Sequence, residues 1–111
     1  MGEKLNRVWL LLVKVRAIGE NSAALSVGSE ALVQVFVPAN AIEFALKEAE
    51  AVVSREGFRQ EDVLSAKSFD SPDDASEMPE FVRKDISEAR TSGTAFTGTF
   101  FTSETSAEFE S

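Results

Sequence analysis

The stretch VFVPANAIEFALKEAEAVVSREGF, residues 35–58, contains the end of one element, a turn and a complete second element. Pro38 has no N–H to donate to a strand ladder and therefore tends to end a strand. Asn40 is a preferred helix N-cap, and Glu43 three positions later completes the pattern of a capping box. Gly57 can adopt the left-handed conformation that follows many helix ends. The stretch therefore predicts a strand, a tight turn and a helix between Asn40 and Gly57.

The predicted helix is amphipathic, because its apolar residues recur at three- and four-residue spacings that place them on one face. They are Ile42, Ala45, Leu46, Ala49, Val52 and Val53. The alternative interpretation of the turn before the helix is an anion-binding site, because free N–H groups at a helix N-terminus can receive an anion. Glu43 beside those groups disfavours an anion. We therefore interpret the stretch as a determinant of fold rather than as a binding site.

Strand patterns flank this unit on both sides. The run RVWLLLVKVRAI, residues 7–18, is rich in β-branched and aromatic residues and alternates, and EALVQVFVP, residues 30–38, does the same. The Gly- and Ser-rich segment 19–29 between them is predicted to be a loop. Three further elements are expected: a strand at Val63–Phe69, a helix between Pro79 and Gly93, and a strand at Thr94–Thr102.

These elements predict an α+β fold with the element order ββαβαβ. A strand, helix and strand within a short stretch is typical of a βαβ unit, so we expect the second and third strands to be parallel. The predicted architecture has two layers, a mixed four-stranded sheet and both helices on one face. The length of 111 residues suits a single domain, which we place at residues 1–102, followed by an acidic, flexible tail at 103–111.

Missing residue types exclude much chemistry. Without cysteine there are no disulfides and no thiolate metal sites, and without histidine there is no side chain that titrates near neutrality. The acidic loop 70–80 holds Asp70, Asp73, Asp74 and Glu77, but their spacing is not that of an EF-hand. The segment GTAFTGTF has threonine where a phosphate-binding loop needs lysine. We expect no cofactor, no metal and no catalytic residue, with a carboxylate- or lysine-dependent enzyme as an alternative.

The net charge of −8 disfavours direct nucleic-acid binding, which depends on clusters of Lys and Arg. The longest apolar run near the N-terminus, VWLLLV at residues 8–13, is six residues long, whereas a membrane span takes about 20. No secretion signal is evident, so we expect no membrane association and a cytoplasmic location.

Several strands have apolar residues on both faces, although two short helices on one side cover only one face of the sheet. The second face needs a cover, which the tail, the 19–29 loop or another chain could provide. A large exposed apolar patch usually marks an interface. We expect a homodimer through the second sheet face, with these interface residues: Val8, Leu10, Leu12, Leu32, Phe36 and Phe101.

The sequence thus favours a noncatalytic protein-interaction module that associates with itself and binds a protein partner. One alternative is an acidic inhibitor of the immunity or antitoxin type, in which charge complementarity speeds capture of a basic partner. The other alternative is the enzyme described above.

Overall fold

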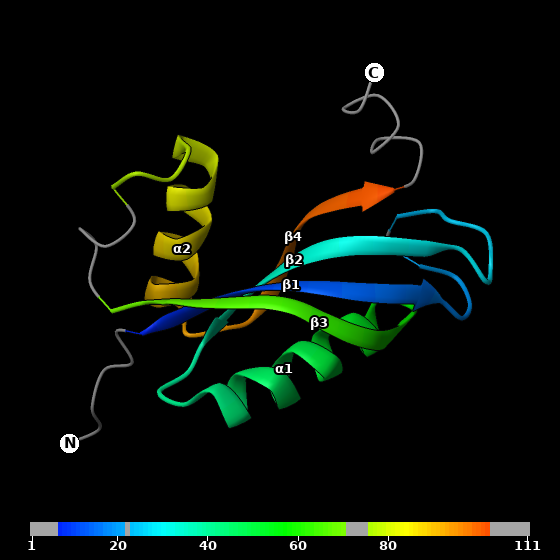
Figure 1. Cartoon of the computed structure of the whole chain (residues 1–111), viewed down its shortest axis with the longest axis horizontal. Helices are drawn as coiled ribbons and strands as arrows, with labels where there is room; N and C mark the ends of the chain where they lie inside the picture. Colours follow the sequence, from blue (N-terminus) through cyan, green and yellow to red (C-terminus); the bar gives the residue numbers. More distant parts are fainter. Residues whose placement is uncertain (1–6, 22, 71–75, 103–111) are drawn as a thin grey trace.

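The computed structural model describes residues 7–21, 23–70 and 76–102, and in this part of the chain six elements follow in the order ββαβαβ (Figure 1). The strands are β1 (Val8–Ala17), β2 (Glu30–Pro38), β3 (Phe58–Phe69) and β4 (Phe96–Thr102), and the helices are α1 (Ile42–Arg55) and α2 (Glu80–Ser92). The predicted α+β class and element order are confirmed. The division into a domain and a tail stays a prediction, because residues 103–111 lie outside the described part.

The sheet has the strand order β3-β1-β2-β4, and each neighbouring pair is antiparallel. The prediction of a mixed sheet was therefore wrong. β2 and β3 do run in the same direction, but β1 lies between them and pairs antiparallel with both. The hairpin of β1 and β2 forms the centre of the sheet, and α1 carries the chain past β1 to the far edge.

The observed ends of α1 match the predicted ends only in part. Gly57 follows the C-cap Glu56 with φ +92°, the left-handed conformation predicted for it. The N-cap, however, is Ala41, and no side chain caps the first turn, so the capping box of Asn40 and Glu43 was wrong. Two long-range hydrogen bonds hold this turn instead: Arg7 Nη1 donates to the Asn40 carbonyl at 2.8 Å, and Trp9 Nε1 donates to the Ala39 carbonyl at 3.1 Å.

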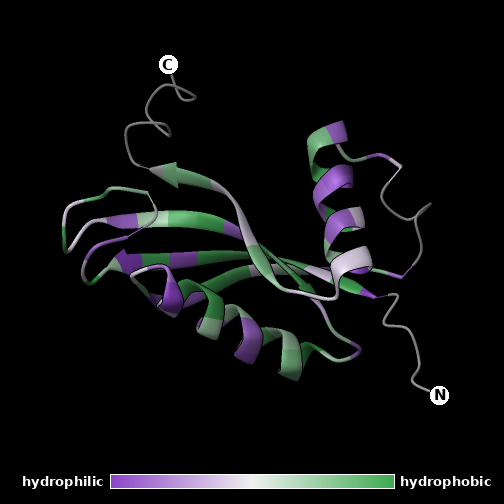
Figure 2. Cartoon of the chain, turned by 180° about the vertical axis from the view of Figure 1, so that it is seen from behind, coloured by the Kyte–Doolittle hydropathy of each residue, from purple (hydrophilic) through white to green (hydrophobic). Residues whose placement is uncertain are grey.

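The two helices lie against opposite faces of the sheet, so the two-layer prediction with both helices on one face was wrong. The first face carries the odd-numbered residues of β1 and β2, which pack with Ala45, Ala49 and Val53 of α1 in one buried cluster. The second face carries a separate cluster that contains Val82 and Ile86 of α2. In Figures 1 and 2, α1 runs along the strands and α2 stands at the end of the sheet where β1 begins.

One helix is enough for the first face because the sheet curls around it. Phe58 of β3 and Phe100 of β4 belong to opposite edges of the sheet, yet their ring centroids are only 5.3 Å apart. Thr97 of β4 also donates a hydrogen bond to the carboxylate of Glu56, just beyond the end of α1. Ala23 and Leu25 of the 19–29 loop add to this first-face cluster. With the first face closed, α2 packs on the second.

Candidate functional site

The second sheet face is only half covered. α2 buries the part of this face near the start of β1, where Val8, Phe36 and Phe69 lie beneath Val82 and Ile86. Beyond α2, the same face continues with partly exposed residues that no helix of the described chain covers. We call this region the open half; its floor consists of Leu12, Leu32, Gln34 and Phe101.

The register of the strands places these four residues side by side. Leu12 of β1 pairs with Gln34 of β2, and Leu32 of β2 pairs with Phe101 of β4. The Oε1 atom of Gln34 is inaccessible and has no hydrogen-bond donor among the described residues. The floor is therefore largely apolar, with one unpartnered acceptor near its middle.

α2 forms a raised wall at one end of the open half. A Cβ atom added at Gly98 of β4 would lie 3.5 Å from Asp85 Oδ2, which places this flank of α2 over β4. Phe81 and Glu88 stand one helical turn before and after Asp85 and share its flank. The Phe81 side chain is 56% exposed. Burial, and to a lesser extent the charge of Glu88, raises the pKa of the Asp85 carboxyl above its ordinary value.

Charged residues border the opposite end of the open half. Lys14 Nζ lies 2.7 Å from Glu30, and Arg16 Nε and Arg59 Nη2 each lie 3.0 Å from Glu61. The hydrogen bond from Lys14 lowers the pKa of Glu30, and those from Arg16 and Arg59 lower the pKa of Glu61. Three cations therefore gather at this border, each already beside a carboxylate.

The six residues predicted for the interface lie together on the second face, but they divide into two groups. Val8 and Phe36 are fully buried beneath α2, and Leu10 packs against the same cluster. Leu12, Leu32 and Phe101 belong to the floor of the open half. Strand alternation was sufficient to find the face, whereas the burial of its first half depends on where α2 packs.

Sequence reasoning missed the contribution of Phe81 and Asp85. Phe81 is a large apolar residue next to Val82, outside the stripe of α2 that Val82, Ile86 and Ala89 form. An apolar residue outside the buried stripe of an amphipathic helix was the available indication of an exposed contact. Nothing in the local sequence indicated that Asp85 would approach Gly98.

The edge strands differ in their capacity for pairing. β3 contains charged residues and two register shifts against β1, features that discourage pairing with another chain. β4 has the sequence FTGTFFT, without a charge or a proline. An uncharged edge strand offers unpaired N–H and C=O groups to a strand of another chain. The free edge of β4 is therefore a second place, beside the open half, at which another chain can pair.

Among the described residues, 7–21, 23–70 and 76–102, no group of three or more potential metal ligands occurs. Asp73 and Asp74 of the acidic loop lie outside that part. No helix within it is long and apolar enough to cross a membrane. No protein-family model matches the chain, and no curated protein or solved structure is significantly similar to it.

Proposed function

We propose that this chain is a noncatalytic interaction module that forms a homodimer through the open half. The observation that supports the proposal is the shape of the second face, half of which is covered by a projecting helix and half of which is bare. Such a surface is complementary to itself. A two-fold axis that lies across the strands, between two facing sheets, brings α2 of each copy beside the open half of the other.

Side-chain type supports the same arrangement. Because the two-fold axis reverses the strand direction, α2 of one copy lies over the open half of the second copy, on the side of its charged border with Lys14 and Arg16. The exposed Phe81 ring of α2 then covers the apolar floor of the other copy. A buried aromatic surrounded by polar contacts is the usual centre of a strong protein interface.

The test compares two phenylalanines of similar exposure on different surfaces. Phe81 is 56% exposed on α2, and Phe44 is 64% exposed on α1. We expect the unmodified chain to sediment as a dimer at tens of micromolar. Phe81→Ser removes a contact twice in each dimer and raises the dissociation constant about tenfold or more. Phe44→Ser, which removes as much exposed apolar surface elsewhere, leaves the dissociation constant unchanged.

A truncation after residue 102 distinguishes a second copy from the tail as the cover of the open half. If the second copy covers it, the truncated chain dimerises as the full chain does. Stronger association after truncation would show that residues 103–111 occupy the face, and a full chain that stays monomeric would contradict the proposal outright. A cytoplasmic location remains part of the proposal, since no residue in the described chain requires another compartment.

A further inference from the structure

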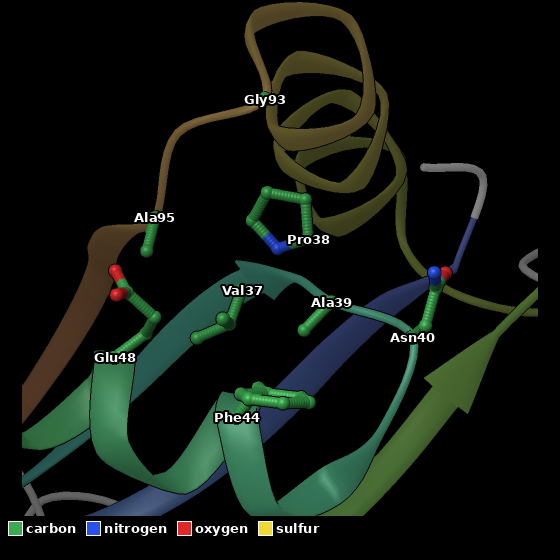
Figure 3. A pocket seen from close by; sticks show the side chains of 8 residues that line it. All are labelled: Val37, Pro38, Ala39, Asn40, Phe44, Glu48, Gly93 and Ala95. Carbon is green, nitrogen blue, oxygen red and sulfur yellow. The ribbon is translucent and has the colours of Figure 1, made fainter. Parts of the chain in front are cut away.

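A separate cavity opens beside the turn that links β2 to α1 (Figure 3). Its volume is about 400 Å³, within the range of about 300–1,000 Å³ in which small-molecule sites fall. Three segments far apart in the sequence form it: the end of β2 with the following turn, the first half of α1, and the link between α2 and β4. The lining residues are Val37, Pro38, Ala39, Asn40, Phe44, Glu48, Gly93 and Ala95.

The walls of this cavity combine apolar side chains with polar groups in nearly equal proportion. Phe44 presents its ring on one side, and Pro38 lies on the other (Figure 3). The Phe44 side chain is 64% exposed, an unusual state for a phenylalanine, which normally buries most of its area. An exposed aromatic face inside a concave site provides a surface for stacking or for a cation.

Glu48 supplies the one charged side chain of the lining. It follows Phe44 by four positions, which places both side chains on the same face of α1, and Figure 3 shows its carboxylate directed toward Ala95. Within the described part of the chain, the Glu48 carboxylate makes no hydrogen bond or ion pair. Residues one turn before and after it, Phe44 and Val52, provide no cation. The carboxylate is therefore available to a ligand.

Two backbone carbonyl oxygens of the turn are already engaged. The carbonyl oxygens of Ala39 and Asn40 already accept hydrogen bonds from Trp9 and Arg7. Arg7 itself pairs with Asp70, its Nε 2.6 Å from Oδ1, so the cation nearest the turn is engaged as well. The side chains of the cavity thus offer an aromatic face, apolar contacts, the Asn40 amide and one carboxylate.

We propose that this cavity binds a small organic cation, a primary ammonium group on an aliphatic chain. The ammonium group donates hydrogen bonds to Glu48 and lies near the Phe44 ring, and the aliphatic part contacts Pro38 and Ala39. Both attractions favour a positive charge, whereas a carboxylate or phosphate would meet the negative charge of Glu48. The net charge of −8 also attracts cations toward the surface. The site is separate from the open half, because none of its lining residues belongs to the floor of that half.

The test uses three probes of one size and three charges: n-butylammonium, n-butanol and butyrate. Amide chemical shifts of a ¹⁵N-labelled full chain are followed during titration. We expect n-butylammonium to shift Phe44, Glu48, Gly93 and Ala95 together and to saturate in the millimolar range. n-Butanol binds about tenfold more weakly, and butyrate binds more weakly still.

Matched variants separate a specific site from general attraction by an acidic chain. Glu48→Gln lowers the affinity for n-butylammonium about fivefold, while Glu43→Gln, which removes the same charge from α1 outside the cavity, leaves it unchanged. Phe44→Leu keeps an apolar side chain but removes the ring face, and lowers the affinity two- to fivefold, about the contribution of an exposed cation–π contact. Equal binding of the three probes, or equal loss in Glu48→Gln and Glu43→Gln, would overturn the proposal.

Discussion

Gly98 is the most direct test of how β4 and α2 meet the second face. An alanine Cβ at this position would lie 2.6 Å from Cε2 of Phe36. That ring is fully buried, stacks on Phe96 with the centroids 5.5 Å apart, and packs in the cluster that contains Ile86 of α2. The ring therefore has little space into which it could retreat. We expect Gly98→Ala to destabilise the chain although alanine usually favours a strand over glycine.

The magnitude follows from two opposing effects. Forcing an extra carbon into a packed cluster costs about 1–3 kcal/mol. Replacing glycine by alanine where the backbone conformation permits it stabilises by about 0.4–1 kcal/mol, because the unfolded chain loses freedom. The φ of Gly98 lies outside the left-handed range, so this second effect applies. The expected net change is a loss of about 1–2 kcal/mol in the free energy of unfolding.

Equilibrium urea denaturation, followed by circular dichroism at one low protein concentration, measures this loss and avoids a contribution from dimerisation. A double-mutant cycle with Phe36→Leu identifies its origin. In the Phe36→Leu background the shorter side chain leaves room for the added Cβ, so Gly98→Ala then costs close to nothing. The coupling between the two substitutions is expected to be about 1–2 kcal/mol. A neutral or stabilising Gly98→Ala, or strictly additive losses, would refute the packing described for this face.

Two further predictions concern the backbone and the charged border. Gly57→Ala should lower the free energy of unfolding, measured by urea denaturation, by about 3 kcal/mol or more, because φ is +92° and the added Cβ would collide with the Glu20 carbonyl oxygen. The control Gly28→Ala should cost only about 1 kcal/mol, because φ there is +94° but no atom lies within 4 Å of the added Cβ. Equal losses in the two variants would contradict the close approach of Gly57 to Glu20. The pKa values of Glu30 and Glu61 are lowered by their cations, so both carboxylates stabilise the fold above the ordinary glutamate pKa of about 4.3 and lose this effect as the pH falls below it. The stability of Glu61→Gln should therefore decline less than that of the unmodified chain between about pH 6 and pH 3.5, and an equal decline would show that the pairs contribute nothing.

Local signals in the sequence were reliable where the identity of a single residue determines the backbone conformation. Gly57 and Gly93 both adopt positive φ at the ends of α1 and α2, as expected for helix stops. The capping box at Asn40 does not form, and the turn is held instead by Arg7 and Trp9, which lie 33 and 30 positions from the carbonyls that they bind. The predicted stripe of α1 held in part: Ala45, Ala49, Val52 and Val53 are buried, Leu46 is partly buried, and Ile42 is exposed.

The sites were predictable to different degrees. The six interface residues share one face because strand alternation has a period of two, and that much follows from sequence. Which of them stay accessible depends on α2, whose path begins at the edge strand β3 and crosses the second face. The cavity beside the turn could not be predicted at all, since Glu48 and Ala95 meet only through the packing of α1 against the start of β4.

The sequence by itself determined the α+β class, the order of the elements and the apolar character of both sheet faces, because these depend on local periodicity and on glycines at helix ends. Only the tertiary structure decided which strands are neighbours, how strongly the sheet curls and which face receives α2. The physical reason is that α1, with its small buried alanines, sits close to a curled sheet and closes the first face alone. The second helix therefore packs on the opposite side and covers half of it. The open half, beside Phe81 and Asp85, stays uncovered because the two helices pack on different faces.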